Sequence, residues 1–201
     1  MTDTKERILQ TALRLFAADG YEAVSVSMIA GELGMTKGAL YKHYENKRAI
    51  FDAILHRMEA RDAQSATEND LPQDTLQNAP ESYRNIGVDS IMSFARAQFR
   101  YWTEDNFASL FRKVLTLEQF RSEEMSRLYR QYLLAGPVGY MTDLFSCMGC
   151  ADARQKAVSF YAPMFLLYSL YDGAADKAEV LRLADDCFEK LGQRLAKEAS
   201  R

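Results

Sequence analysis

The chain has 201 residues, of which 48% are hydrophobic and 26% are charged, and this balance excludes an intrinsically disordered protein. A net charge of −3 at pH 7 excludes a uniformly basic nucleic-acid binder, and no apolar run approaches the roughly 18 residues of a membrane span. The 3 cysteines do not make a disulfide framework and the polar N-terminus is no secretory signal, so we expect a cytoplasmic protein with no membrane partner.

Positive charge is concentrated near the N-terminus. Residues 1–50 carry 7 Lys/Arg against 6 Asp/Glu, whereas residues 51–201 carry 18 against 22. Within residues 36–48 there are 4 basic side chains and 1 acidic side chain. A small positive patch on an acidic body is typical of a DNA-reading module attached to a module that does not bind DNA.

Apolar residues at helical spacing predict four helices in the first quarter of the chain. The first ends before Gly20, a residue typical of helix stops. Ser25 and Thr36 can cap a second and a third helix, and about three residues that include Gly34 separate the two. This spacing is the helix-turn-helix signature. A fourth helix begins near Asn46.

The helical pattern disappears between residues 66 and 82, where we expect a loop that is long for a compact domain. Periodicity then returns and predicts helices over residues 86–102, 106–115, 123–148, 152–171 and 178–199. Gly136-Pro137 should kink the third of these. Because no convincing strand alternation is present, the sequence predicts an all-α fold of about nine helices.

Residues 36–43 have the pattern of a helix that can enter the major groove. Such a helix needs a small or polar outer face and an apolar anchor, here Leu40. The outer face, called the reading face below, consists of Thr36, Lys37, Gly38, Ala39, Lys42 and His43. Small residues and a threonine methyl suit thymine, and a lysine suits guanine. Tyr41, His43 and Lys47 are phosphate candidates, the last because a helix start favours an anion over a cation.

These residues resemble the N-terminal domain of the TetR family of repressors. The matching residues are Phe16-Ala-Ala-Asp-Gly20-Tyr21, Ser25, Ile29-Ala30, Gly34 to Tyr44, and Lys47. Met28 departs from the usual acidic residue and Met35 from the usual valine. The resemblance covers about a quarter of the chain. It implies a three-helix helix-turn-helix DNA-binding domain over residues 1–47 and a helical effector-binding and dimerisation domain over residues 48–201.

The resemblance also implies a function. The protein would be a homodimeric repressor that binds a palindromic double-stranded operator and is released by a small, largely apolar effector, with no cofactor or metal. The implied DNA contacts are Ser27, Thr36, Lys37, Gly38, Tyr41, Lys42, His43 and Lys47. Catalysis has no support, because the chain lacks HExxH, Gly-x-Ser-x-Gly, Walker-type and dinucleotide-binding motifs.

The helical body supplies candidate residues for the effector and for the second subunit. Its aromatic residues, Phe120 among them, should form the core first, and the resemblance implies a mostly apolar pocket among them. Candidate pocket residues are Phe94, Arg96, Phe99, Trp102, Phe111, Tyr132, Phe165 and Tyr168. The last two helices would pair with their twofold mates as a four-helix bundle. Candidate dimer contacts are Phe160, Met164, Leu167, Tyr171, Leu183, Phe188 and Leu191.

Two other hypotheses stay open from the sequence. Cys147-Met-Gly-Cys150 is a CxxC motif, and its two thiols can sense oxidation in a DNA-binding regulator. The same two cysteines can also be ordinary, partly buried residues at the end of a helix. A helical ligand-binding protein that no longer binds DNA would keep the same motif at residues 25–47. An enzyme is a more distant alternative.

Overall fold

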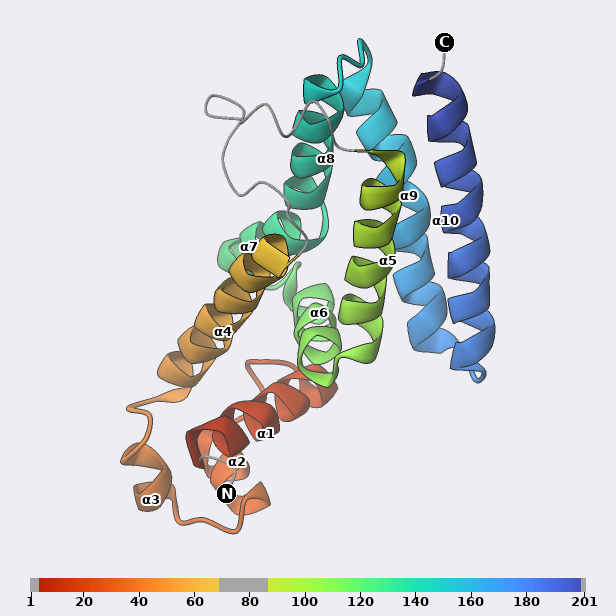
Figure 1. Cartoon of the computed structure of the whole chain (residues 1–201). Helices are drawn as coiled ribbons and strands as arrows, with labels where there is room; N and C mark the ends of the chain where they lie inside the picture. Colours follow the sequence, from red (N-terminus) through yellow and green to blue (C-terminus); the bar gives the residue numbers. More distant parts are fainter. Residues whose placement is uncertain (1–3, 69–86, 200–201) are drawn as a thin grey trace. The chain divides into compact units, whose positions relative to one another are not determined.

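A computed structural model describes residues 4–68 and 87–199, and Figure 1 shows them as helices joined by short turns. The described residues form ten α-helices and no strand, which confirms the all-α prediction. The helices are α1 (Thr4–Asp19), α2 (Val26–Glu32), α3 (Lys37–Tyr41), α4 (Lys47–Glu68), α5 (Val88–Glu104), α6 (Asn106–Glu118), α7 (Glu123–Leu133), α8 (Ala135–Cys147), α9 (Ala153–Gly173) and α10 (Lys177–Ala199). Among these described helices none is long and apolar enough to cross a membrane.

The helices gather into two compact units. The first unit, Met1–Glu68 with Asn106–Tyr129, contains α1 to α4, α6 and most of α7. The second unit, Asn69–Asp105 with Arg130–Arg201, contains α5, the end of α7, and α8 to α10. The helix-turn-helix therefore shares a compact unit with α4 and α6, which lie after it in the chain. The functional boundary between residues 47 and 48 stays a prediction.

Local signals in the sequence explain where the helices of the first unit begin and end. The side chains of Ser25, Thr36 and Asn46 each accept a hydrogen bond from the backbone N–H three residues on, at 3.2, 3.2 and 2.8 Å. These bonds satisfy donors that every helix start leaves unpaired. Gly20, just after α1, has φ +87°, and Gly34, after α2, has φ +65°. The predicted caps at Ser25 and Thr36 and stops at Gly20 and Gly34 are confirmed, and α4 begins next to Asn46 as expected.

The core of the first unit is built on the apolar stripe of α1. Phe16 of α1 and Phe51 of α4 are fully buried, with ring centroids 6.5 Å apart. The Tyr21 ring packs edge-on against Phe16 at 5.0 Å and in a tilted arrangement against Phe51 at 5.2 Å. The helix α6 also packs along α1. Burying one large apolar side chain stabilises a fold by about 2–3 kcal/mol, so these rings hold the helix-turn-helix to α4.

The second unit has an aromatic core formed by α5, α9 and α10. Phe99 of α5 stacks on Tyr168 of α9 at 5.5 Å and meets the edge of Phe188 of α10 at 5.8 Å. Trp102 and Tyr132 make a further edge contact at 6.4 Å. All five side chains are buried. For these residues the prediction that aromatics form the core first is confirmed.

One aromatic residue assigned to the core lies on the surface instead. Phe120 is 89% exposed and follows α6, in the turn that leads to α7. The prediction was wrong because Phe120 is not on a helix that could direct its ring inward. Residue composition alone does not distinguish a turn position from a helix position.

The predicted long helix over residues 123–148 is two helices, α7 and α8, and this adds the tenth helix. The chain breaks at Leu134, whose φ and ψ are −132° and −89°. A side chain at Gly136 would overlap the carbonyl oxygen of Gln131, so glycine is required there. Pro137 falls in the first turn of α8, where its missing N–H costs little. The break also frees the carbonyl of Leu133, which accepts a hydrogen bond from the Tyr161 hydroxyl at 2.9 Å.

Several helix ends differ by one to three residues from those expected, including both helix ends next to the predicted loop. The helix α4 continues to Glu68, three residues into the predicted loop over 66–82. The helix α5 begins at Val88 rather than at residue 86. The rest of the predicted loop lies outside the described residues.

Candidate DNA interface

The surface of α3 and its N-terminal turn carries most of the predicted DNA-reading residues. Leu40 is 0% exposed and anchors α3 to the unit, as the sequence predicts. The members of the predicted DNA-contact set that are exposed are Ser27, Thr36, Lys37, Gly38, Tyr41 and Lys42. His43 and Lys47 are half-buried. The fold thus brings small and basic residues together on an outward surface.

The turn between α2 and α3 holds this surface in place. The Met35 N–H donates to the Ala30 carbonyl at 2.9 Å, which ties the turn back to α2. Gly34, with φ +65°, supplies the left-handed conformation that this turn requires. Because Thr36 caps α3 and Leu40 is buried, the reading face has little freedom to move on its own.

Two exposed lysines give this surface a positive charge. The Lys37 ammonium lies 5.6 Å from the ring centroid of Tyr41, one turn along α3. Lys42 follows directly after the helix. Cations on an exposed helix favour DNA because each phosphate they contact releases counterions.

Lys47, a predicted phosphate contact, bonds to the turn that follows α1. Its ammonium donates to the carbonyl of Tyr21 at 2.7 Å and to that of Glu22 at 3.3 Å, and it lies 4.2 Å from the Tyr21 ring centroid. These partners explain how a cation is accommodated at the start of α4, where the helix dipole disfavours it. Lys47 therefore ties α4 to the turn after α1, and its contact with phosphate stays a prediction.

A buried carboxylate on α6 holds the same turn. Glu118 is 1% exposed, and its Oε1 accepts hydrogen bonds from the Tyr21 N–H at 2.9 Å and from Arg121 Nη1 at 3.0 Å. A buried ion needs such partners, because an unpaired charge in the interior costs several kcal/mol. Burial also raises the pKa of the neighbouring Tyr21, so its hydroxyl stays protonated. The helix α6 is thus bonded directly to the domain that carries the reading face.

Glu118 was not predicted from the sequence, although a signal for it was present. Phe111, Val114 and Leu115 are buried and occur at helical spacing on α6, and Glu118 continues the same stripe one turn later. An acidic residue on an apolar stripe indicates a buried, bonded carboxylate. Its partner, the Tyr21 N–H, is 97 residues away in the chain and has no signal in the sequence.

An ion pair joins α4 to α7. The two Nη atoms of Arg48 bond the two carboxylate oxygens of Glu124 at 2.6 and 2.7 Å, and Arg48 Nε bonds Asp52 at 2.7 Å. The two-point geometry with Glu124 is the strong form of this pair. The hydrogen bonds from Arg48 lower the pKa of the Glu124 carboxyl.

We expect Glu124→Gln to lower the free energy of unfolding by about 0.5–1 kcal/mol at pH 7, because the pair is partly exposed to solvent. A lowered pKa in the folded state means that the stabilisation is present above the unfolded value of about 4.3 and is lost as pH falls through the folded value. Urea denaturation at pH 7 and at pH 3 should therefore show a difference at pH 7 that shrinks at pH 3. Glu123→Gln, an exposed neighbour, is the control. An equal difference at both pH values would contradict the assignment.

Comparison with known proteins agrees with this geometry. Residues 8–54 match the family described as bacterial regulatory proteins, tetR family. This N-terminal segment is therefore similar to the members of that family. The matched segment contains α2, α3 and the start of α4, and therefore the complete reading face.

Two individual proteins are similar to this chain in sequence, and one solved structure is similar to it in fold. The regulator YerO of Bacillus subtilis is 46% identical over 50 residues, which are 25% of this chain and 17% of YerO. The class D tetracycline repressor of Escherichia coli is 32% identical over 97 residues, 48% of this chain and 40% of that protein. The chain thus matches less than half the length of these relatives. A structure of AibR with isovaleryl coenzyme A and operator DNA shares the fold, at 21% identity and a TM-score of 0.63, over 94% of this chain and 98% of AibR.

Four of the eight predicted effector-pocket residues are packed against one another in two pairs. Phe99, Trp102, Tyr132 and Tyr168 form the core of the second unit, whereas Phe111 lies in the first unit. Arg96 faces Asp185 of α10 at 3.9 Å. Phe94 lies 5.9 Å from the Tyr140 ring, and Phe165 lies 6.4 Å from the Tyr161 ring. Their role in effector binding stays a prediction.

The predicted dimer contacts divide by burial. Phe160, Met164, Leu167 and Phe188 are buried within the second unit, at 6% exposure or less. Tyr171 and Leu191 are half-buried, and Leu183 is 45% exposed. The large apolar residues of α9 that remain exposed are Val158, Leu166 and Leu170, at 48%, 60% and 44%. Periodicity identified the helices, but it did not show which face of each helix the chain itself covers.

The CxxC has a structural role at the end of α8. Gly149, between the two cysteines, has φ +79°, and its N–H donates to the Ser146 carbonyl at 3.0 Å. The Cys150 N–H donates to the Phe145 carbonyl at 3.0 Å. This is the Schellman helix stop. Cys147 and Cys150 are free, half-buried thiols, and their redox role stays a hypothesis.

Proposed function

We propose that the protein is a homodimeric transcriptional repressor, acting in the cytoplasm, that binds a palindromic operator and is released by a small-molecule effector. The exposed reading face on a buried Leu40 anchor, inside a tetR-family domain, carries the proposal. The relatives support it: one matched protein is named as a tetracycline repressor, and AibR was solved with an acyl coenzyme A and operator DNA.

The DNA contacts fall into two classes. Thr36, Lys37 and Gly38 would lie at base edges in the major groove, where they decide the sequence that is bound. Tyr41 and His43 would contact phosphates, which decide affinity and register. Ser27 of α2 and Lys42, which follows α3, would be further phosphate contacts. Lys47 would support both classes of DNA contact indirectly, because it holds the turn after α1 in place.

A second copy of the chain would bind through α9. Val158, Ala162, Leu166 and Leu170 follow at intervals of four residues and are all exposed, so they form an apolar stripe along one helix face. Leu183 of α10 is a further exposed apolar side chain of the second unit. Symmetric dimers are the commonest oligomers, and a dimer reads two half-sites about one helical turn apart.

Effector binding would reach the DNA through α6 and α7. The helix α7 belongs to both units, up to Tyr129 in the first and from Arg130 in the second. A shift of α7 would act on α4 through the pair between Arg48 and Glu124, and Glu118 would pass a shift of α6 to the turn after α1. The coupling energy required is about 1–3 kcal/mol.

Selection of bound duplexes from random DNA, at near-physiological salt, tests the function. We expect a twofold-symmetric site, because the dimer places two identical reading faces on the duplex. Lys37→Met should then weaken binding to that site by about 5- to 150-fold and relax base preference at one position in each half-site. Lys190→Met, an exposed lysine on α10, is the matched control and should change nothing. No shared sequence among the selected duplexes would contradict the proposal.

A further inference from the structure

Two of the three free thiols lie together at the end of α8. Cys147 is the last residue of α8, and Cys150 follows three residues later, before α9 begins at Ala153. Both cysteines are half-buried, so part of each side chain is open to solvent and to small solutes. The proposed repressor mechanism uses neither thiol.

The turn that separates the two thiols is held by two backbone hydrogen bonds. The Gly149 N–H donates to the Ser146 carbonyl and the Cys150 N–H donates to the Phe145 carbonyl, both at 3.0 Å. Gly149 has φ +79°, the left-handed conformation on which this helix stop depends. A left-handed residue at this position directs the chain away from the helical path, and with it the Cys150 side chain.

A right-handed Gly149 would bring the two thiols together. In a continued α-helix, Cα atoms three residues apart lie about 5 Å from each other, within the range of about 4.4–6.8 Å that a disulfide needs. Glycine adopts either hand, and a Cβ atom at residue 149 would meet no other described residue within 4 Å, so none of these residues opposes the change. The two N–H groups would exchange acceptors, Gly149 bonding to Phe145 and Cys150 to Ser146.

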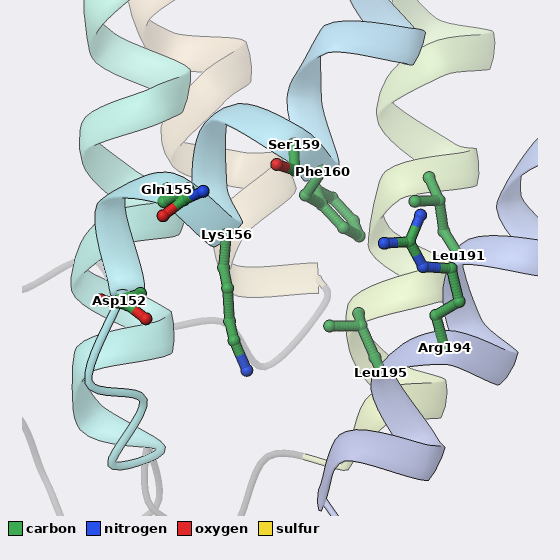
Figure 2. Close-up of a pocket in the computed structure, with 8 residues that line it drawn as sticks. All are labelled: Asp152, Gln155, Lys156, Ser159, Phe160, Leu191, Arg194 and Leu195. Atoms are coloured by element: carbon green, nitrogen blue, oxygen red, sulfur yellow. The ribbon is translucent and has the colours of Figure 1, made fainter.

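This change would reach α9, which carries the proposed dimer stripe. Phe145, in the last turns of α8, contacts Phe160 of α9 edge-on at 5.9 Å, and both rings are buried. Toward α10, the first turns of α9 border a pocket of about 250 Å³, whose lining includes Asp152 and Phe160 of the α9 wall and Leu191 of α10 (Figure 2). The space in this pocket allows the start of α9 to move when the turn before it changes.

We propose that Cys147 and Cys150 form a modification site, which a hydroperoxide oxidises to an intramolecular disulfide, and that this disulfide weakens operator binding. The disulfide holds Gly149 in the right-handed conformation and changes how α9 follows α8. In the proposed dimer, α9 would hold two reading faces about one helical turn of DNA apart, so a change at its start would disturb their match to the half-sites. Only the effect on the operator rests on the proposed function.

The oxidation consumes one hydroperoxide for each pair of thiols. The sulfur of one deprotonated cysteine attacks the terminal peroxide oxygen, the O–O bond breaks, and the alkoxide leaves and takes up the thiol proton, so a sulfenic acid remains. The sulfur of the second cysteine then attacks the first sulfur, the S–S bond forms, and the S–O bond breaks with loss of water. The cysteines lose two electrons and the peroxide gains them.

Counting the alkylated thiols tests the site without DNA. Trypsin should release Cys147 and Cys150 in one peptide, residues 131–154, and Cys187 in another, residues 183–190. We expect N-ethylmaleimide to label both thiols of the first peptide in reduced protein, neither thiol after treatment with hydrogen peroxide, and both again after dithiothreitol. Two labels that persist after peroxide, labels that dithiothreitol does not restore, or a disulfide that includes Cys187 or joins two chains would overturn the site.

Operator affinity tests the regulation. Reduced wild-type protein that binds no operator would count against the proposed function, whereas the labelling result stands by itself. When the reduced protein binds, we expect peroxide to weaken operator binding by about 5- to 150-fold and dithiothreitol to restore it. Equal operator affinity of the reduced and disulfide forms would overturn the regulation.

Serine variants assign the effect to the two cysteines. The double variant Cys147→Ser with Cys150→Ser should bind the operator as the reduced wild type does and should not respond to peroxide. The matched control is Cys187→Ser, a half-buried thiol of α10, which should respond as the wild type does. A double variant that still responds to peroxide would contradict the assignment. The unfolding temperature of each variant shows whether it is folded.

Discussion

Replacing both Leu166 and Leu170 with glutamate should convert the proposed dimer into a monomer and weaken operator binding by more than about 100-fold. The two side chains are 60% and 44% exposed, so their loss leaves the core of the second unit intact. In the proposed dimer they lie at the interface, where an unpaired buried carboxylate costs several kcal/mol. A monomer keeps one reading face and loses the second half-site.

Light scattering after size exclusion measures the mass, and a titration with the selected operator measures the affinity. The matched control is Ser93→Glu with Ala97→Glu, which places two glutamates four residues apart on an exposed face of α5. This control should remain a dimer. If the α9 variant also remains a dimer and binds operator normally, the stripe on α9 is not the interface.

Gly20→Ala should lower the free energy of unfolding of the first unit by about 2–4 kcal/mol, through two separate costs. The first is conformational, because φ +87° is a left-handed conformation that costs a residue with a side chain about 1–2 kcal/mol. The second is steric. A Cβ atom at residue 20 would lie 2.8 Å from Glu118 Oε1 and 2.6 Å from Arg121 Nη1. Arg121 can move aside, but Glu118 is buried and bonded to the Tyr21 N–H.

Gly34→Ala separates the two costs. Gly34 also has a positive φ, +65°, but a Cβ atom there meets nothing within 4 Å. We therefore expect a loss of about 1–2 kcal/mol at residue 34, and urea unfolding midpoints should show the additional loss at residue 20. Equal losses at the two glycines would mean that Glu118 yields easily and does not hold the turn. Operator affinity of the folded fraction should fall for Gly20→Ala as well, because Tyr21 and Lys47 share that turn.

Features that depend on neighbouring residues were predicted well. The caps at Ser25, Thr36 and Asn46 act over three residues, so the chain needs no other part of the molecule to start these helices. The buried anchor Leu40 among mostly exposed neighbours was predicted for the same reason, because this pattern lies within one short segment of the chain. An interruption near Gly136-Pro137 was predicted, but as a kink in one helix, whereas the chain breaks at Leu134 into two helices. How far the chain bends there depends on which groups of the folded protein can donate hydrogen bonds to the carbonyls before the break.

Features that depend on distant partners were not predicted. The bond from the Tyr21 N–H to Glu118 spans 97 residues, and the carbonyl partners of Lys47 lie 25 and 26 residues before it. Phe120 and Leu166 are both large and apolar, and nothing near them in the chain indicates that both are exposed.

The sequence by itself therefore determined most of the helices, the caps of α2 and α3, the buried anchor Leu40 and the similarity of the N-terminal segment to the tetR family, because each of these follows from spacing within a few residues. The tertiary structure decided which helix faces are covered, which polar groups are buried, and where α9 and α10 leave an opening. These depend on burial, and burial is set by segments that the chain brings together only when it folds. Periodicity shows which residues share a face, and only packing shows what lies against that face.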